Sequence, residues 1–205
     1  MPMSPDNVKA LLTELADWFQ FEGIGPTELL VCGGAAMALQ HLHDRTTRDV
    51  DVLGQWDQRL LEVTCIEDFP ENVRSCIRRV ANSHPELEGF GEHWVNLGPK
   101  HLAKQGLPKG YASRLHSMKF GKAGLLTLHL LDRTDLIALK LYAAADGFSS
   151  RQEIHFDDLR LLKGSFDELD TALDWVRTLS NFEEKRPEIQ NVLERLGYDD
   201  LAGYV

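Results

Sequence analysis

Two aspartates, Asp49 and Asp51, are separated by one valine and followed by another. In a β-strand, alternate side chains point to the same face, so this spacing predicts both carboxylates on one face and Val50 and Val52 on the other. The two aspartate Cα atoms would lie about 7 Å apart, because a strand rises about 3.3 Å per residue. Both carboxylates could therefore bind one hard divalent cation between them.

Two adjacent glycines, Gly33 and Gly34, follow a short apolar run from Glu28 to Cys32. The next segment, from Ala35 to His43, is rich in Ala, Leu and Met and favours a helix. Backbone N–H groups at a helix start bind phosphate, and glycine has no Cβ to keep the phosphate away. The stretch from Leu29 to Leu53 therefore predicts a strand, a glycine turn, a helix and a second strand that carries both aspartates.

These residues resemble the signature of the polymerase-β-type nucleotidyltransferase superfamily: Gly33-Gly34, then Thr46 and Thr47, then Asp49-x-Asp51. More narrowly, the chain resembles small bacterial nucleotidyltransferases related to the toxins of abortive-infection (type IV) toxin–antitoxin systems. Two later segments are similar to the same family, and the matches together cover positions from about 30 to 160. These segments are Asp135-Leu-Ile-Ala-Leu-Lys140-Leu-Tyr-Ala and His155-Phe-Asp-Asp158-Leu.

The resemblance implies roles for the first group of residues. Asp49 and Asp51 would bind Mg²⁺, which also bridges the phosphates of a nucleoside triphosphate such as ATP. Gly33 and Gly34 would hold the triphosphate through backbone donors, and Thr47 and Arg48 would also contact the nucleotide. An acceptor hydroxyl would attack the α-phosphorus, and pyrophosphate would leave.

The resemblance also implies roles for residues of the later segments. Lys140 would contact the triphosphate. Asp158 would complete the site as a base or a second metal ligand, and the neighbouring Asp157 is the alternative for that position. The expected acceptor is an RNA such as tRNA, or a protein, and a cognate antitoxin is a further expected partner.

Three positions depart from the family pattern. The superfamily usually carries a third acidic residue on a later strand, but Leu125 to Leu131 contains none, and His129 is expected on the aspartate face there. Asp146 and His155 stand where the family often has basic residues. Because each change removes a metal ligand or a positive charge, a non-catalytic nucleotide- or RNA-binding protein on the same scaffold is the alternative. Transfer to a small molecule such as an aminoglycoside is a third possibility.

The charge is unevenly distributed along the chain. The formal net charge is −10, which argues against nucleic acid binding over the whole surface. The segment from His93 to Leu131 has no acidic residue and carries six basic ones, Lys100, Lys104, Lys109, Arg114, Lys119 and Lys122. This segment predicts either a local site for a triphosphate or RNA backbone, or a solvated stretch whose lysines pair with acidic neighbours.

Composition and length indicate a cytoplasmic protein that does not enter a membrane. No run approaches the roughly 18 apolar residues of a transmembrane helix, and the first residues do not resemble a signal peptide. The three cysteines, Cys32, Cys65 and Cys76, lack metal-ligand spacing and are expected to be reduced thiols. A chain of 205 residues fits one domain, or one domain with a small extension.

The expected fold is of the α/β or α+β class, with a small mixed sheet flanked by helices and a C-terminal helical bundle. Residues 1–131 would form the nucleotidyltransferase core, and residues 132–205 a helical subdomain that completes the active site. Periodicity predicts a helix from Glu71 to Ser83 and a hairpin of two strands, 116–120 and 125–131. It also predicts a short helix over 57–61 and a last helix that starts at Pro187.

Overall fold

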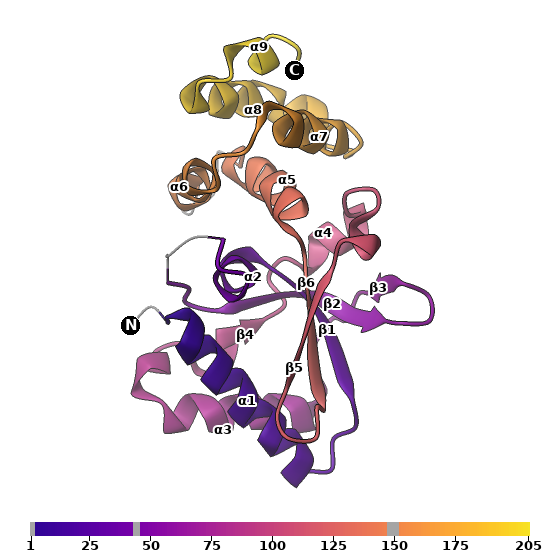
Figure 1. Ribbon diagram of the computed structural model, residues 1–205, viewed down its shortest axis with the longest axis vertical. Coiled ribbons are helices and arrows are strands. Elements are labelled where there is room, and N and C mark those ends of the chain that lie inside the picture. Colours follow the sequence, from indigo (N-terminus) through magenta and orange to yellow (C-terminus); the bar gives the residue numbers. More distant parts are fainter. Residues whose placement is uncertain (1–2, 43–45, 147–151) are drawn as a thin grey trace. The chain divides into compact units, whose positions relative to one another are not determined.

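The computed structural model describes residues 3–42, 46–146 and 152–205 (Figure 1). The chain divides into two compact units. The first, which we call the sheet unit, comprises Met1–Lys104 and Ala112–Leu131. The second, the helical unit, comprises Gln105–Tyr111 and Asp132–Val205.

A mixed sheet of six strands forms the centre of the sheet unit in the described part of the chain (Figure 1). The strands follow the order β3-β2-β1-β6-β5, and β4 also pairs with β2. The pairs β1–β6 and β2–β4 are parallel, and the others are antiparallel. The mixed sheet confirms the predicted fold class. The strands are β1 (Thr27–Cys32), β2 (Val50–Asp57), β3 (Glu62–Thr64), β4 (Val95–Asn96), β5 (His116–Phe120) and β6 (Leu126–Leu130).

A bulge in β2 determines which residues share a face of the sheet. Leu30 pairs with Gly54 and Val31 pairs with Val52, so Leu53 is an extra residue on β2. The register places apolar side chains on one face, all at most 1% exposed: Val31, Val52, Leu128 and Leu130. The other face, which we call the aspartate face, carries Glu28, Cys32, Asp51, Trp56, Ser117 and His129.

Helices of the sheet unit bury the apolar face. Ser4 caps the first helix by accepting the Asn7 N–H, and the apolar stripe of that helix, which includes Leu12, Leu15 and Phe19, is buried. The same helix contacts β5 and β6. The helices are α1 (Pro5–Phe21), α2 (Gly33–Leu39), α3 (Glu71–Ser83) and α4 (Lys100–Gln105), with short 3₁₀ turns at Pro85–Leu87, Gly91–Trp94 and Tyr111–Ser113.

The helical unit is built around α5, which contacts α6, α7 and α8. Asp132 caps α5 by accepting the Asp135 N–H, and Ser165 and Glu168 form a capping box at α7. Buried leucine, valine and aromatic side chains from these helices form its core. The helices are α5 (Arg133–Ala144), α6 (Gln152–Leu162), α7 (Phe166–Val176), α8 (Phe182–Leu196) and α9 (Asp199–Ala202).

Two local predictions are wrong. Residues 57–61 do not form a helix: the Asp57 carboxylate accepts the backbone N–H groups of Arg59 and Leu60, which closes a turn between β2 and β3. The last long helix starts at Phe182 and contains Pro187 in its interior. Proline lacks one N–H donor, and this long amphipathic helix tolerates the loss of that single bond because its apolar side chains are buried.

Two predictions drawn from composition have an outcome in the structure. Among the described residues, no helix has the length and apolar character needed to cross a membrane. Cys32 and Cys76 are buried and Cys65 is half-buried, and no disulfide joins any of these three residues.

Candidate active site

Gly33 and Gly34, which we call the glycine turn, are the first two residues of α2 and not a separate turn before it as predicted, and they contact the residues that precede and begin β2. Gly33 has φ +70°, a conformation that residues with a Cβ rarely adopt, and a Cβ there would overlap Oδ2 of Asp51. A Cβ on Gly34 would lie 2.7 Å from Oγ1 of Thr47. The two glycines are therefore required so that the backbone can approach a carboxylate and a hydroxyl this closely.

The two aspartates occupy the positions on either side of Val50. Both are half-buried, whereas Val50 and Val52 are at most 1% exposed, and this alternation matches the predicted division between two faces. Asp49 lies just before β2 and not within it as predicted. The reason is local, because the Asp49 carbonyl accepts the Thr47 hydroxyl at 3.0 Å and so leaves the strand ladder.

The loop before β2 is held by the N-terminal segment. The backbone of Thr47 pairs with that of Met3 through hydrogen bonds of 2.6 and 3.0 Å. Thr47 is buried, whereas Thr46 and Arg48 on either side are exposed. The buried Thr47 hydroxyl therefore orients the loop, and Arg48 is exposed to solvent.

The strand register places Asp51 and Asn96, two residues with oxygen-bearing side chains, beside each other on neighbouring strands. Asp51 pairs with Cys32 on β1 and with Asn96 on β4, and the Asn96 side-chain oxygen accepts the Gly98 N–H at 2.8 Å. Mg²⁺ is usually held by one or two carboxylates together with substrate phosphates and water, and does not need a complete protein cage. Within residues 3–42, 46–146 and 152–205, no group of three or more His, Cys, Asp or Glu side chains gathers as a metal site. The pair Asp49 and Asp51 fits the smaller donor set that Mg²⁺ needs.

The predicted lysine and acid of the helical unit contact each other. Nζ of Lys140 lies 2.6 Å from Oδ2 of Asp158, and the two side chains are only 8% and 3% exposed. Nδ1 of His155 lies 3.4 Å from the same ammonium group. Asp157, the alternative to Asp158, is exposed and lies 3.8 Å from Arg160. The structure therefore groups Lys140 with Asp158 and separates Asp157 from it.

Each unit thus assembles part of the predicted site. In the sheet unit, Gly33 and Gly34 lie against Asp51 and Thr47. In the helical unit, Lys140 binds Asp158 beside His155.

The strand on which a third acid was expected carries His129, which binds an acid from another strand. The register confirms that His129 lies on the aspartate face, because it pairs with Leu30, two residues before Cys32 on β1. Nε2 of His129 lies 2.8 Å from Oε2 of Glu28, and Nδ1 lies 2.8 Å from Oγ of Ser117. Sequence reasoning missed Glu28 and Ser117, although a single acid inside the apolar strand 27–32 was a usable signal.

Part of the basic segment is neutralised by an acidic neighbour. Glu67 binds both Lys104 and Lys100, and these two hydrogen-bonded ion pairs lower the pKa of the Glu67 carboxyl to about 2. For Lys100 and Lys104, the structure therefore confirms the second alternative, in which lysines of the segment 93–131 pair with acidic neighbours.

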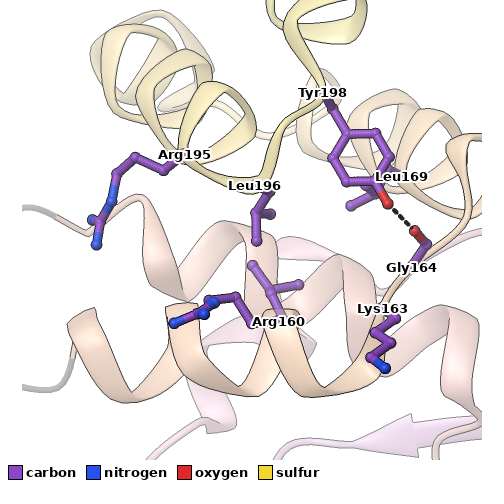
Figure 2. Close-up of a pocket in the computed structure, with 8 residues that line it drawn as sticks. Arg160, Lys163, Gly164, Leu169, Arg195, Leu196 and Tyr198 are labelled. Atoms are coloured by element: carbon purple, nitrogen blue, oxygen red, sulfur yellow. Dashed lines mark hydrogen bonds between the residues drawn. The ribbon is translucent and has the colours of Figure 1, made fainter.

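The helical unit also contains an open pocket of about 240 Å³ (Figure 2). Its lining includes the apolar side chains of Leu159, Leu169 and Leu196 and the basic side chains of Arg160, Lys163 and Arg195. Figure 2 shows the Tyr198 hydroxyl donating to the Gly164 carbonyl at 2.5 Å at one end of this pocket. None of the predicted site residues lines it.

Comparison with known proteins gives one match. Neither the curated proteins nor the solved structures contain a match to this chain. A family model described as a nucleotidyltransferase of unknown function (DUF6036) matches residues 10–155, which include the glycine turn, both aspartates and Lys140. Because the match covers well over half of the chain, the protein belongs to this nucleotidyltransferase family.

Proposed function

We propose that the protein is a Mg²⁺-dependent nucleotidyltransferase that moves a nucleoside monophosphate from a nucleoside triphosphate to the hydroxyl of an RNA, such as tRNA, or of a protein. The observation that carries the proposal is the contact between the glycine turn and Asp51, in a chain that belongs to a nucleotidyltransferase family. A side chain at residue 33 would overlap the Asp51 carboxylate, so the position of that carboxylate depends on the glycine backbone.

The residues of the sheet unit would bind and orient the nucleotide. Asp49 and Asp51 supply the carboxylates that hold Mg²⁺, and the bound ion would neutralise the charge that develops on the α-phosphate and pyrophosphate. Thr47 fixes the Asp49 backbone through its hydroxyl. The exposed guanidinium of Arg48 would contact a phosphate oxygen.

For the helical unit, the resemblance implies that Lys140 contacts the triphosphate and that Asp158 assists it. The ammonium of Lys140 would oppose the negative charge of the triphosphate, and Asp158 holds that ammonium in one position through the 2.6 Å ion pair. A cation fixed by a buried acid loses less conformational freedom on meeting a substrate than a mobile surface lysine does.

Label transfer tests the proposal. The protein is incubated with Mg²⁺, α-³²P-labelled nucleoside triphosphates and either total RNA or a protein extract. We expect label on one acceptor class, and a loss of about a hundredfold or more for the variant with both Asp49→Ala and Asp51→Ala. Asp57→Asn, at the other end of β2, is the matched control and should retain transfer. Equal transfer by the double variant would refute the assignment.

We also propose that the protein acts as the toxin of a toxin–antitoxin pair, as the resemblance implies. Expression of the wild-type chain should then arrest growth, and co-expression of the cognate antitoxin should restore it. Arrest that persists in the Asp49→Ala, Asp51→Ala variant would contradict a toxic activity based on nucleotidyl transfer.

A further inference from the structure

Three side chains of the sheet unit have the arrangement of an activated nucleophile. Nδ1 of His129 lies 2.8 Å from Oγ of Ser117, and Nε2 lies 2.8 Å from Oε2 of Glu28. An ionised carboxylate only accepts hydrogen bonds, so Nε2 of the neutral imidazole carries the proton and Nδ1 accepts the Ser117 hydroxyl proton. Nucleophile, base and orienting acid therefore form one continuous chain.

The three residues differ in their exposure to solvent, and this difference suits nucleophilic chemistry. His129 is 5% exposed, and its ring packs against Trp56 with the centroids 5.4 Å apart. Glu28 is half-buried, whereas Ser117 is exposed on β5, the last strand in the order of the described sheet. The base is thus held in a fixed orientation while the hydroxyl is open to another molecule.

The ammonium group of Lys119 indicates which class of electrophile Ser117 would attack. Lys119 lies two residues after Ser117, so its side chain is on the same face of β5, with the two Cα atoms about 7 Å apart. Lys119 is exposed. An exposed ammonium next to a nucleophile favours an anionic donor, and a phosphoryl group matches that charge better than a neutral ester does.

We propose that Ser117 is a nucleophilic site that accepts the nucleotidyl group of a nucleoside triphosphate; this donor rests on the proposed function. Oγ of Ser117 attacks the α-phosphorus, and the new P–O bond forms as the bond to the pyrophosphate oxygen breaks. The hydroxyl proton passes to Nδ1 of His129, and Glu28 stabilises the resulting imidazolium. Pyrophosphate leaves, and the chain carries a phosphodiester on Ser117.

The geometry of the sheet indicates that a second copy of the chain supplies the nucleotidyl group. Ser117 and Asp51 are separated by three strand spacings and two residues along the sheet. This corresponds to about 16 Å between the two Cα atoms. An α-phosphate held at Asp51 would not reach the hydroxyl of its own chain, so the reaction is intermolecular.

Self-labelling tests this site directly. With α-³²P-labelled nucleoside triphosphates and Mg²⁺, we expect label on Ser117, at a rate per chain that rises with protein concentration. The Asp49→Ala, Asp51→Ala chain should be labelled by a trace of wild type. Ser117→Ala should lose the label, and Ser83→Ala, an exposed serine of the same unit, should retain it. His129→Gln should slow labelling about a hundredfold. Labelling of Ser117→Ala at the wild-type level would overturn the proposal.

A fluorophosphonate probe separates this inference from the proposed function, because it needs neither nucleotide nor metal. We expect the probe to modify Ser117 in the Asp49→Ala, Asp51→Ala chain and to fail with His129→Gln. If no acceptor receives nucleotide but the probe labels Ser117, the proposed function fails and the nucleophilic site stands. If RNA or protein is labelled while neither reagent modifies Ser117, the proposed function stands and this inference is wrong.

Discussion

The carboxylate of Asp51 lies against the α-carbon of Gly33, so closely that a Cβ on residue 33 would overlap Oδ2. The contact joins the end of β1 to the beginning of β2, two strands that also pair through Cys32 and Asp51. The position of one predicted metal ligand therefore depends directly on the absence of a side chain on its neighbour.

Gly33→Ala should lower activity and stability more than a comparable glycine substitution elsewhere. Gly23→Ala is the matched control, because Gly23 has φ +68° and nothing within 4 Å of the added Cβ. Both variants incur the left-handed backbone penalty of about 1–2 kcal/mol, but only Gly33→Ala displaces Asp51. Urea unfolding and label transfer measure the two effects, and equal transfer by the two variants would contradict the proposed role of the contact.

Nucleotide binding should depend on Mg²⁺ through Asp51. Titration calorimetry with a nucleoside triphosphate should show affinity that falls at least about tenfold on addition of EDTA. Asp51→Asn preserves shape but removes charge, so its affinity should be weak with or without EDTA. Binding by the wild type that survives EDTA and weakens steeply with salt would favour the non-catalytic nucleotide- or RNA-binding alternative.

Removing one partner of the Lys140–Asp158 pair should destabilise the protein strongly. Asp158→Leu leaves a buried ammonium without its counter-ion, which costs about 3–5 kcal/mol. The double variant Lys140→Met, Asp158→Leu replaces both charges and should recover most of the loss in urea unfolding. The exposed Asp157→Leu is the control and should change stability by about 0.5 kcal/mol or less.

The same series separates folding from catalysis. If Lys140 opposes the charge of the triphosphate, the double variant should be folded and inactive. Wild-type transfer by that variant would mean that the ion pair serves folding alone.

His84 should make stability depend on pH through Glu14, since Nε2 of His84 lies 2.6 Å from Oε2 of Glu14 on α1. This hydrogen bond raises the pKa of His84 above its ordinary value of about 6.5, while burial opposes the shift. Folding therefore favours the protonated ring, so the stabilisation is complete below pH of about 6.5 and is lost as the pH rises through the folded pKa.

The melting temperature of wild type and His84→Gln tests this linkage. The gap between them should be wider at about pH 5.5 than at about pH 8.5. In Glu14→Gln, the added substitution His84→Gln should produce a gap that changes less with pH than in the wild type, because only Glu86, 3.3 Å from Nδ1, still pairs with the ring. A gap that widens as the pH rises would reverse the sign and contradict the pair.

Local patterns in the sequence predicted the elements that depend on nearby residues. The helix Glu71–Ser83 has the predicted bounds, and the caps Ser4 and Asp132 are residues of the types that favour a helix start. Such features depend on hydrogen bonds within one or two turns, which a single sequence contains in full. The alternation of aspartates and valines also predicted the burial pattern around β2.

Relationships between distant segments were not visible in the sequence. Glu28 and His129 are 101 positions apart, and only the parallel pairing of β1 with β6 brings them together. Likewise, Thr47 showed no sign that its hydroxyl would bind the Asp49 carbonyl, because that bond competes with the strand ladder that alternation favours. Pairing partners and local competition of this kind depend on the whole fold.

The extra residue Leu53 makes the strand β2 sensitive to the deletion of a single residue. Suppose that β2 lost this residue while keeping its pairing near Trp56. Every side chain before residue 53 would then move to the opposite face of the sheet. The two aspartates would lie on the buried apolar face, and Val50 and Val52 would lie on the aspartate face. The reading frame would be intact, and yet Asp49 and Asp51, the proposed metal ligands, would no longer lie on the aspartate face. The spacing of this strand is therefore as strict a requirement as the identity of its residues.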